Sequence, residues 1–214
     1  MRPPESWHRA PATVAIALVT AAAWLLVAML GAQESVAYWG GFVPARVGDS
    51  AGAWPELLSL LLTPLSATLI HTGVLHLLFN LVVLLYCGRA VEGVLGTRPL
   101  AIIYVVGAYV AAAAEYAAGP NSIVTMIGAS GAISAVVGAY AMLFGRNRVR
   151  VASPAVATLL NALWVAAGWV ILQLLIGYAL GTIGTPIAIA AHIGGFLAGL
   201  AMAKPLLLWR WRGA

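Results

Sequence analysis

Residues 57–88 read LLSLLLTPLSATLIHTGVLHLLFNLVVLLYCG and contain no Asp, Glu, Lys or Arg. This run is longer than the roughly 20 apolar residues with which one helix crosses a bilayer. Pro64 interrupts it, and a proline is unfavourable inside a helix and restricts the residue before it. We therefore expect a membrane-spanning helix over about 65–88, preceded by an interfacial segment over 57–63.

The rest of the chain repeats this alternation of apolar runs with short charged or turn-rich segments. Of its 214 residues, 63% are hydrophobic and 8% are charged, which is too little charge for a soluble domain of this size. Spanning helices are expected over about 12–31, 65–88, 99–118, 128–145, 154–176 and 187–208.

These runs predict an all-α membrane protein with one membrane domain over 12–208. The first apolar run is longer than the core of a signal peptide, so we expect it to be a retained helix. Residues 1–11 and 209–214 are then expected to be short tails, both in the cytoplasm.

The basic residues predict how the chain is oriented. With a cytoplasmic N-terminus, all of the 11 Lys and Arg residues except Arg46 fall on the cytoplasmic side, as the positive-inside rule requires. The net charge of +5 is too small and too scattered to favour nucleic-acid binding. The single cysteine, Cys87, excludes a disulfide within the chain and is expected to pack between helices.

Polar residues inside spanning helices are costly, so each needs a reason. His71, His76 and Asn80 fall in the outer half of the expected helix 65–88, whereas Ser130 and His192 fall near the outer starts of two later helices. The expected orientation therefore places a serine, histidines and an asparagine in one layer below the outer surface.

Ser130 lies in the sequence Gly-Ala-Ser-Gly, residues 128–131. Backbone amides at a helix N-terminus can receive a developing negative charge, so a serine there has part of an oxyanion hole at hand. The alternative is that Gly128, Ser130 and Gly131 only allow close packing between helices.

His192 precedes Gly195 and Gly199, which form a GxxxG surface suited to close packing on a neighbouring helix. His192 lies on nearly the same face, so it is carried towards whichever helix these glycines contact. If that helix carries Ser130, His192 can take the serine proton. A purely structural hydrogen-bonding role is the alternative.

His76 and Asn80 are four residues apart, share a helix face and both carry hydrogen-bond donors. His71 is expected on another face, in a structural or loop-facing role. A metal site built from the histidines is a rival use, but the chain has no HExxH motif and the cluster has no carboxylate. Nothing in the sequence places Glu115 beside His192, so a Ser–His pair without metal or cofactor is the simpler reading.

These three motifs, His71-x4-His76-x3-Asn80, GASG and AHxxGxxxG, resemble those of the rhomboid intramembrane proteases in order and spacing over about residues 65–203. The resemblance implies a six-helix bundle with a cavity opening outward, in a bacterial plasma membrane. It implies Ser130 as nucleophile, His192 as base, and His76 and Asn80 with backbone amide as oxyanion donors. It also implies single-pass membrane proteins as substrates, and leaves the oligomeric state open.

The chain departs from the family pattern at two places. Many rhomboids carry a Trp-Arg pair whose arginine can meet a glutamate after the second helix, but here the pair is Leu62-Thr63, and Glu92 would lack that partner. Ser134 replaces an aromatic residue that can stack on the histidine in relatives. Two further functions stay open: a rhomboid-like protein that only binds membrane helices, and a small transporter whose histidines conduct protons.

Overall fold

The computed structural model describes residues 10–47, 56–145, 153–179 and 188–212. Within these ranges the chain is helical, and an isolated antiparallel bridge joins Phe42 to Met126. The expected tail 1–11 and the expected helix start at 187 fall largely or wholly outside the described residues. The all-helical fold agrees with the sequence prediction.

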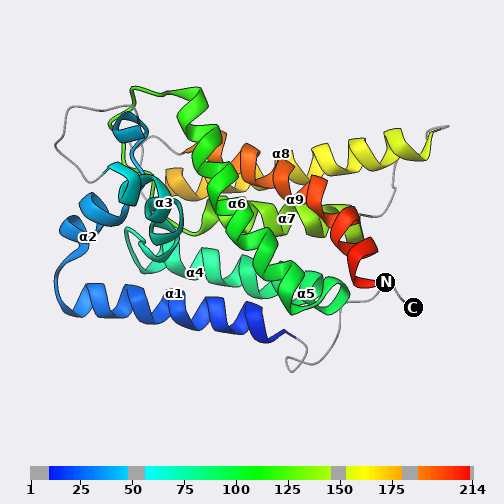
Figure 1. Cartoon of the computed structure of the whole chain (residues 1–214), viewed down its shortest axis with the longest axis horizontal. Helices are drawn as coiled ribbons and strands as arrows, with labels where there is room; N and C mark the ends of the chain where they lie inside the picture. The colour runs from blue at the N-terminus through cyan, green and yellow to red at the C-terminus, as the bar shows by residue number, and fades with distance from the viewer. Residues whose placement is uncertain (1–9, 48–55, 146–152, 180–187, 213–214) are drawn as a thin grey trace.

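The helices form one bundle (Figure 1). The α-helices are α1 Pro11–Met29, α2 Gln33–Gly40, α3 Glu56–Ser66, α4 Val74–Val83, α5 Arg89–Leu95, α6 Thr97–Ala118, α7 Ser130–Phe144, α8 Pro154–Ala179 and α9 Ile189–Arg210. Short segments η2 Pro44–Val47, η3 Ala67–Leu69 and η4 Leu84–Gly88 lie between them. Helices α4, α7 and α9 all begin at the end of the bundle where α2 and α3 lie (Figure 1).

Four helical segments are long and apolar enough to cross a membrane: Pro11–Met29, Val74–Leu95, Thr97–Ala118 and Ile189–Arg210. The apolar helix Ser130–Phe144 and the apolar segment Leu159–Leu172 are shorter. The outward faces of these long and short helices fit a lipid environment, since large apolar side chains such as Leu26, Val82 and Trp164 are exposed. These features make the chain an integral membrane protein, whereas six complete crossings stay a prediction.

The expected helix 65–88 differs most from the structure. Pro64 does not start a new helix, because it lies inside α3, and the chain continues through η3 and an extended Gly73 before α4 begins at Val74. At the other end the helix does not stop at residue 88: a π-helical turn leads into α5, which ends at Leu95. The helix therefore ends at Gly96, whose φ of 92° terminates α5, and not at Gly88 as expected.

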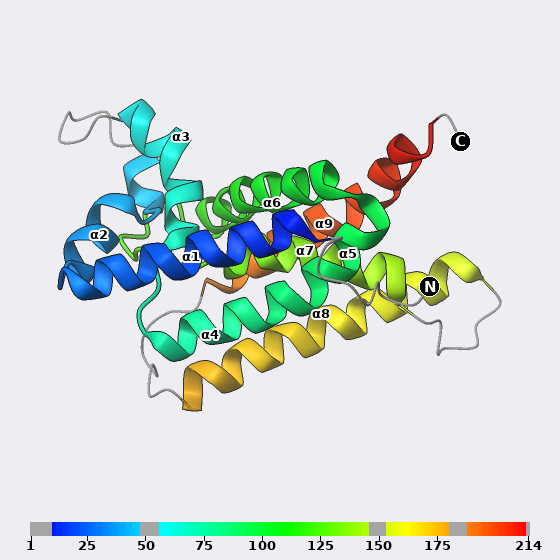
Figure 2. The same ribbon diagram turned by 90° about the horizontal axis from the view of Figure 1, so that it is seen from below.

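Helix α7 lies in the middle of the bundle and is buried along most of its length. Alanine, glycine and serine make up eight of its 15 residues, so the backbones of α6 and α9 can approach it closely. Figure 2 shows the bundle from below, with α8 at the edge of the bundle. The central position of α7 lets several neighbouring helices direct side chains at its first turn.

Glu92 connects the start of α1 to α5. Its side chain is 1% exposed, and its two carboxylate oxygens accept the backbone N–H groups of Ala12 and Thr13 at 2.9 and 2.8 Å and the Thr13 hydroxyl at 2.7 Å. These N–H groups are among those that an α-helix leaves unpaired at its N-terminus, where a negative charge is also favourable. The bonds to α1 give Glu92 a role that requires no arginine partner.

Replacing Glu92 by alanine is therefore expected to destabilise the bundle by about 3 kcal/mol, because charge-assisted hydrogen bonds are lost and α1 donors are left buried. The measurement is the midpoint of thermal unfolding in detergent. Glu34→Ala is the matched control, since Glu34 is exposed in the first turn of α2. Equal midpoints for Glu92→Ala and the wild type would contradict this role.

Candidate active site

Ser130 is the first residue of α7, directly after a sharp turn at Gly128. Gly128 has φ of 108°, a backbone conformation that favours glycine. Its N–H donates to the Ala67 carbonyl at 2.8 Å, which fixes the turn against η3. The turn, rather than a helix beginning at 128 as the sequence suggested, presents Ser130 at the N-terminal end of α7.

The structure brings Ser130 and His192 together from two helices. The Ser130 Oγ lies 2.8 Å from the His192 Nε2, and the residues are 8% and 6% exposed. This distance suits a hydrogen bond between a hydroxyl and an imidazole. A serine and a histidine in this arrangement can share a proton, which is the geometry that general-base activation of a nucleophile requires.

Close contact between α7 and α9 makes this meeting possible. A Cβ added to Gly195 would overlap the Gly131 carbonyl oxygen, and a Cβ added to Gly199 would overlap the Ala135 carbonyl oxygen. Gly131 in turn faces α6, where an added Cβ would lie 2.8 Å from the Ala111 Cβ. The glycine surface after His192 thus packs on the helix that carries Ser130.

His76, in the first turn of α4, lies against Gly128. A Cβ built on Gly128 would be 2.7 Å from the His76 Cε1, 2.9 Å from its Nε2 and 3.8 Å from the Ser130 Oγ. The other ring nitrogen, Nδ1, lies 3.3 Å from the Thr72 hydroxyl. When Thr72 donates to Nδ1, the ring hydrogen resides on Nε2, which is then a donor on the side of Gly128.

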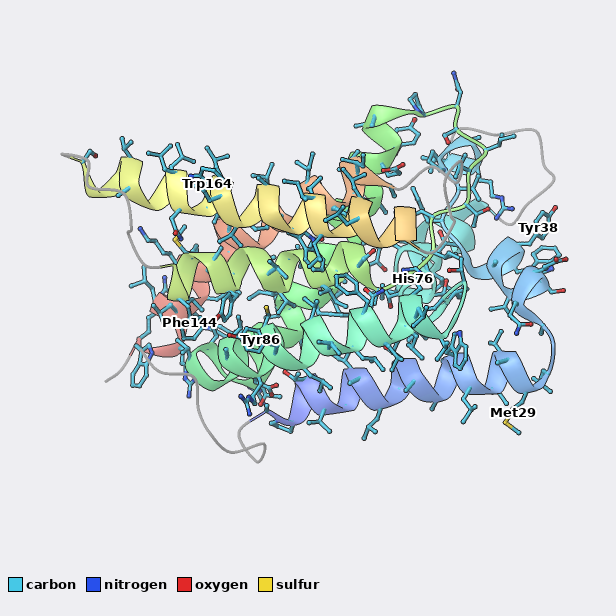
Figure 3. The ribbon with its side chains drawn as sticks, turned by 180° about the vertical axis from the view of Figure 1, so that it is seen from behind. Met29, Tyr38, His76, Tyr86, Phe144 and Trp164 are labelled. Carbon is cyan, nitrogen blue, oxygen red and sulfur yellow. The ribbon has the colours of Figure 1, made fainter. Side chains whose placement is uncertain are left out.

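Asn80 lies one turn further along α4 and is 1% exposed. Its Nδ2 donates to the His76 carbonyl at 2.9 Å, and its Oδ1 is buried without a hydrogen-bond partner in the described part of the chain. Figure 3 shows His76 at the end of the bundle opposite Phe144, which is the end where α7 begins.

His71 supports the turn from the other side. Its Nε2 accepts the N–H of Ala129 at 3.4 Å, and its ring packs edge-on against His76 with centroids 4.9 Å apart. Burial, together with the nearby His76, lowers the pKa of His71 from 6.5 to about 3. His71 is therefore neutral at physiological pH and its Nε2 can accept a hydrogen bond.

This pKa has a consequence for stability. Between pH 6.5 and about 3 the unfolded chain binds a proton at His71 that the folded chain does not bind, so acidification should destabilise the fold. We expect the thermal midpoint to fall less steeply between pH 6.5 and 4 in His71→Gln, whose side-chain oxygen can still accept the Ala129 N–H, than in the wild type. Parallel pH curves would contradict a neutral, buried His71.

Two polar contacts of the site were not predicted from the sequence. Glu115, at the end of α6, accepts the backbone N–H of Ala191 at 3.1 Å and so caps the first turn of the helix that carries His192. Trp169, on α8, donates from its Nε1 to the Ser134 Oγ at 2.7 Å. The sequence did contain a signal for the contact between Trp169 and Ser134, because a serine buried in an apolar helix needs a hydrogen-bond partner.

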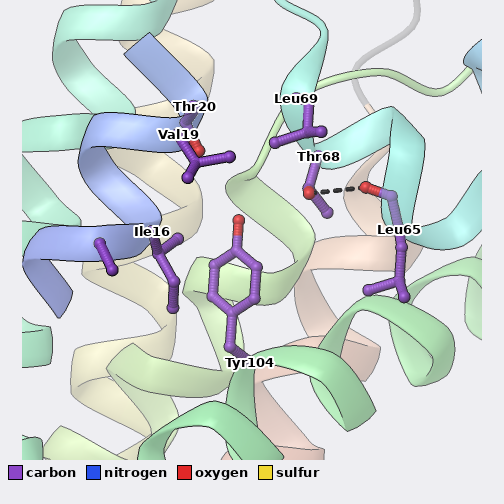
Figure 4. A pocket seen from close by; sticks show the side chains of 8 residues that line it. Ile16, Val19, Thr20, Leu65, Thr68, Leu69 and Tyr104 are labelled. Atoms are coloured by element: carbon purple, nitrogen blue, oxygen red, sulfur yellow. Dashed lines mark hydrogen bonds between the residues drawn. The ribbon is translucent and has the colours of Figure 1, made fainter. Parts of the chain in front are cut away.

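A hollow of about 320 Å³ lies away from these residues, between α1, η3 and α6 (Figure 4). Its lining is almost entirely apolar, with Ile16, Leu65 and Leu69 among the side chains shown. The hydroxyls of Thr20 and Tyr104 are buried at its wall without a partner in the described residues. Ser130 and His192 do not line this hollow, so it is separate from the candidate site.

Among the described residues, no group of three or more His, Cys, Asp or Glu side chains is arranged so that it could hold a metal ion. Cys87 is a buried free thiol in η4. The polar groups gathered at the start of α7 are thus a hydroxyl, imidazoles, an amide and backbone N–H groups.

Comparison with known proteins identifies curated relatives, each named "Rhomboid protease GlpG". The protein from Pectobacterium atrosepticum is 33% identical over 196 residues, covering 90% of this chain and 62% of the relative. That of Klebsiella pneumoniae is 30% identical over 199 residues, with the same coverage. That of Haemophilus influenzae is 28% identical over 180 residues, covering 82% of this chain and 80% of the relative.

The chain thus spans 62% of the length of the first two of these relatives. The family description that matches the chain is the rhomboid domain, over residues 59–209. This range includes α4, α7, all but the last residue of α9, and all the residues of the candidate site. This chain belongs to the rhomboid family.

Proposed function

We propose that this chain is an intramembrane serine endopeptidase that hydrolyses peptide bonds in the transmembrane segments of other membrane proteins. The observation that carries the proposal is the 2.8 Å contact between the Ser130 Oγ and the His192 Nε2, made by two separate helices of a rhomboid domain. The relatives named as rhomboid proteases support the same reaction class.

In the proposed reaction the Ser130 Oγ attacks the substrate carbonyl carbon while the His192 Nε2 accepts the hydroxyl proton. The carbonyl oxygen becomes an oxyanion. When the peptide bond breaks, His192 gives its proton to the leaving amine, and the acyl group remains on Ser130. His192 then takes a proton from water, the hydroxide displaces the acyl group as a carboxylic acid, and Ser130 regains its proton.

The oxyanion needs donors that are already in place. The Ser130 backbone N–H is one of the unpaired donors at the start of α7. We propose His76 as a second oxyanion donor, because it lies against Gly128. We propose Asn80 as a third, because it lies on the same face of α4 as His76. The Asn80 Nδ2 has a second hydrogen besides the one that it donates to the His76 carbonyl.

The length of α7 supports a reaction below the membrane surface. A helix of 15 residues is about 22 Å long, several ångströms shorter than the hydrocarbon core of about 30 Å. With cytoplasmic termini, as the basic residues predict, Ser130 lies below the outer boundary and the site opens outward. A substrate helix must unwind there to expose a carbonyl, so small or helix-breaking residues are expected near the cut.

The test is cleavage of a single-pass reporter protein by the full chain in liposomes made with H₂¹⁸O. We expect two fragments, with one ¹⁸O atom in the new carboxyl terminus, because water resolves the acyl-enzyme. An intact reporter that binds the protein would favour a non-catalytic rhomboid-like protein. An intact reporter together with solute or proton flux would favour a transporter, and either result would contradict the proposal.

A further inference from the structure

Ser134 lies one helical turn after Ser130 and is completely buried. Its Oγ contacts two groups at hydrogen-bonding distance: the Ser130 carbonyl oxygen at 2.7 Å and the Trp169 Nε1 at 2.7 Å. An indole N–H can only donate, so Ser134 must accept from Trp169. The serine hydrogen is then directed at the Ser130 carbonyl, and the direction of the whole chain of bonds is fixed.

Trp169 is itself held in place on α8. It is 6% exposed, and its ring stacks on Phe79 with centroids 5.7 Å apart and planes inclined by 16°. Phe79 precedes Asn80 on α4. One side chain thus joins α8 and α4 to the first turn of α7.

Ser134 also contacts the helix of His192. A Cβ built on Gly195 would lie 3.3 Å from the Ser134 Cβ, and Gly195 follows His192 by three residues. The side chain that Trp169 orients therefore lies where α9 packs closely on α7.

From these contacts we propose that Trp169 is a positioning residue, which acts through Ser134 to hold the first turn of α7 so that Ser130 faces His192. A side-chain bond to the carbonyl four residues earlier can bend a helix locally, so we infer that this bond influences the direction of the Ser130 Cα–Cβ bond. Displacements of about 1 Å are enough to slow catalysis markedly. The inference rests on the proposed protease function. In it, Trp169 and Ser134 orient Ser130 through their hydrogen bonds.

The experiment measures kcat and KM for cleavage of the reporter in liposomes by wild type, Trp169→Phe, Ser134→Ala and the double variant. Phenylalanine keeps an aromatic ring against Phe79 and removes the N–H donor. We expect each single change to lower kcat about tenfold with KM unchanged. The double variant should be no slower than Ser134→Ala, because both changes break one chain of bonds. Trp164→Phe, an exposed tryptophan on the same helix, is the control and should match the wild type.

Three results would overturn the inference while the wild type is active: kcat of Trp169→Phe within about twofold of wild type, single effects that multiply in the double variant, or a rise in KM without a fall in kcat. The last would mean that Trp169 serves substrate entry rather than Ser130. A wild type without any cleavage would instead end the proposed function, and this inference with it.

Discussion

Replacing Ser130 by alanine is expected to reduce cleavage of a membrane reporter to the background rate, a loss of at least about a thousandfold. Alanine removes the only atom that can form the acyl-enzyme in the proposed reaction. The folded structure should persist, because the variant loses only the hydrogen bond between the serine hydroxyl and His192. The close packing of the α7 backbone on α9 does not depend on that hydroxyl. The thermal midpoint should therefore change little.

The control for this prediction is Ser122→Ala. Ser122 lies in the turn before α7, where its hydroxyl contacts the Val124 N–H at 3.3 Å, away from the Ser130–His192 pair. The Ser122→Ala substitution removes a serine Oγ, as Ser130→Ala does, and should leave turnover unchanged. Undiminished cleavage by the Ser130 variant would show that another group is the nucleophile.

Replacing Gly199 by valine is expected to prevent the bundle from assembling. Any Cβ at this position would lie 2.5 Å from the Ala135 carbonyl carbon and 2.8 Å from its Cα, and would overlap the carbonyl oxygen. Backbone atoms cannot rotate away as a flexible side chain can, so α9 must separate from α7. We expect aggregated or unfolded protein in detergent, observed by size-exclusion chromatography and by loss of a cooperative thermal transition.

Gly168→Ala is the matched control, since a Cβ there meets no atom within 4 Å. This change should preserve the fold and even strengthen α8 slightly, because alanine is the better helix former. A well-folded Gly199→Val protein with wild-type turnover would contradict the close packing of α7 on α9.

The sequence predicted which residues lie together in the candidate site better than it predicted the local backbone geometry there. The sequence indicated that one site contains Ser130, His192 and the glycines after His192. Polar residues inside apolar helices, and small residues at helix contacts, serve few purposes in a membrane protein. The same reasoning placed His76 and Asn80 on one helix face. These predictions depended on spacing within a helix, which is regular.

The start of α4 and the role of Glu92 could not be predicted in this way. Residues 65–73 carry no charge and continue an uncharged run into α4, so hydropathy could not show that α4 begins only at Val74. Glu92 was expected to lack the arginine partner that it can meet in many rhomboids. The partners that it has instead are backbone N–H groups of α1, which leave no signature in a side-chain pattern. The contact of Glu115 with Ala191 escaped prediction for the same reason.

The most direct test of the central claim, that His192 activates Ser130 as a nucleophile, is labelling with a fluorophosphonate followed by peptide mapping. The wild type should gain one phosphonyl group, on Ser130. His192→Asn, which retains a polar side chain but has no comparable base, should be labelled at least about a hundredfold more slowly. Labelling at another residue, or labelling of Ser130 at an unchanged rate in His192→Asn, would contradict the account.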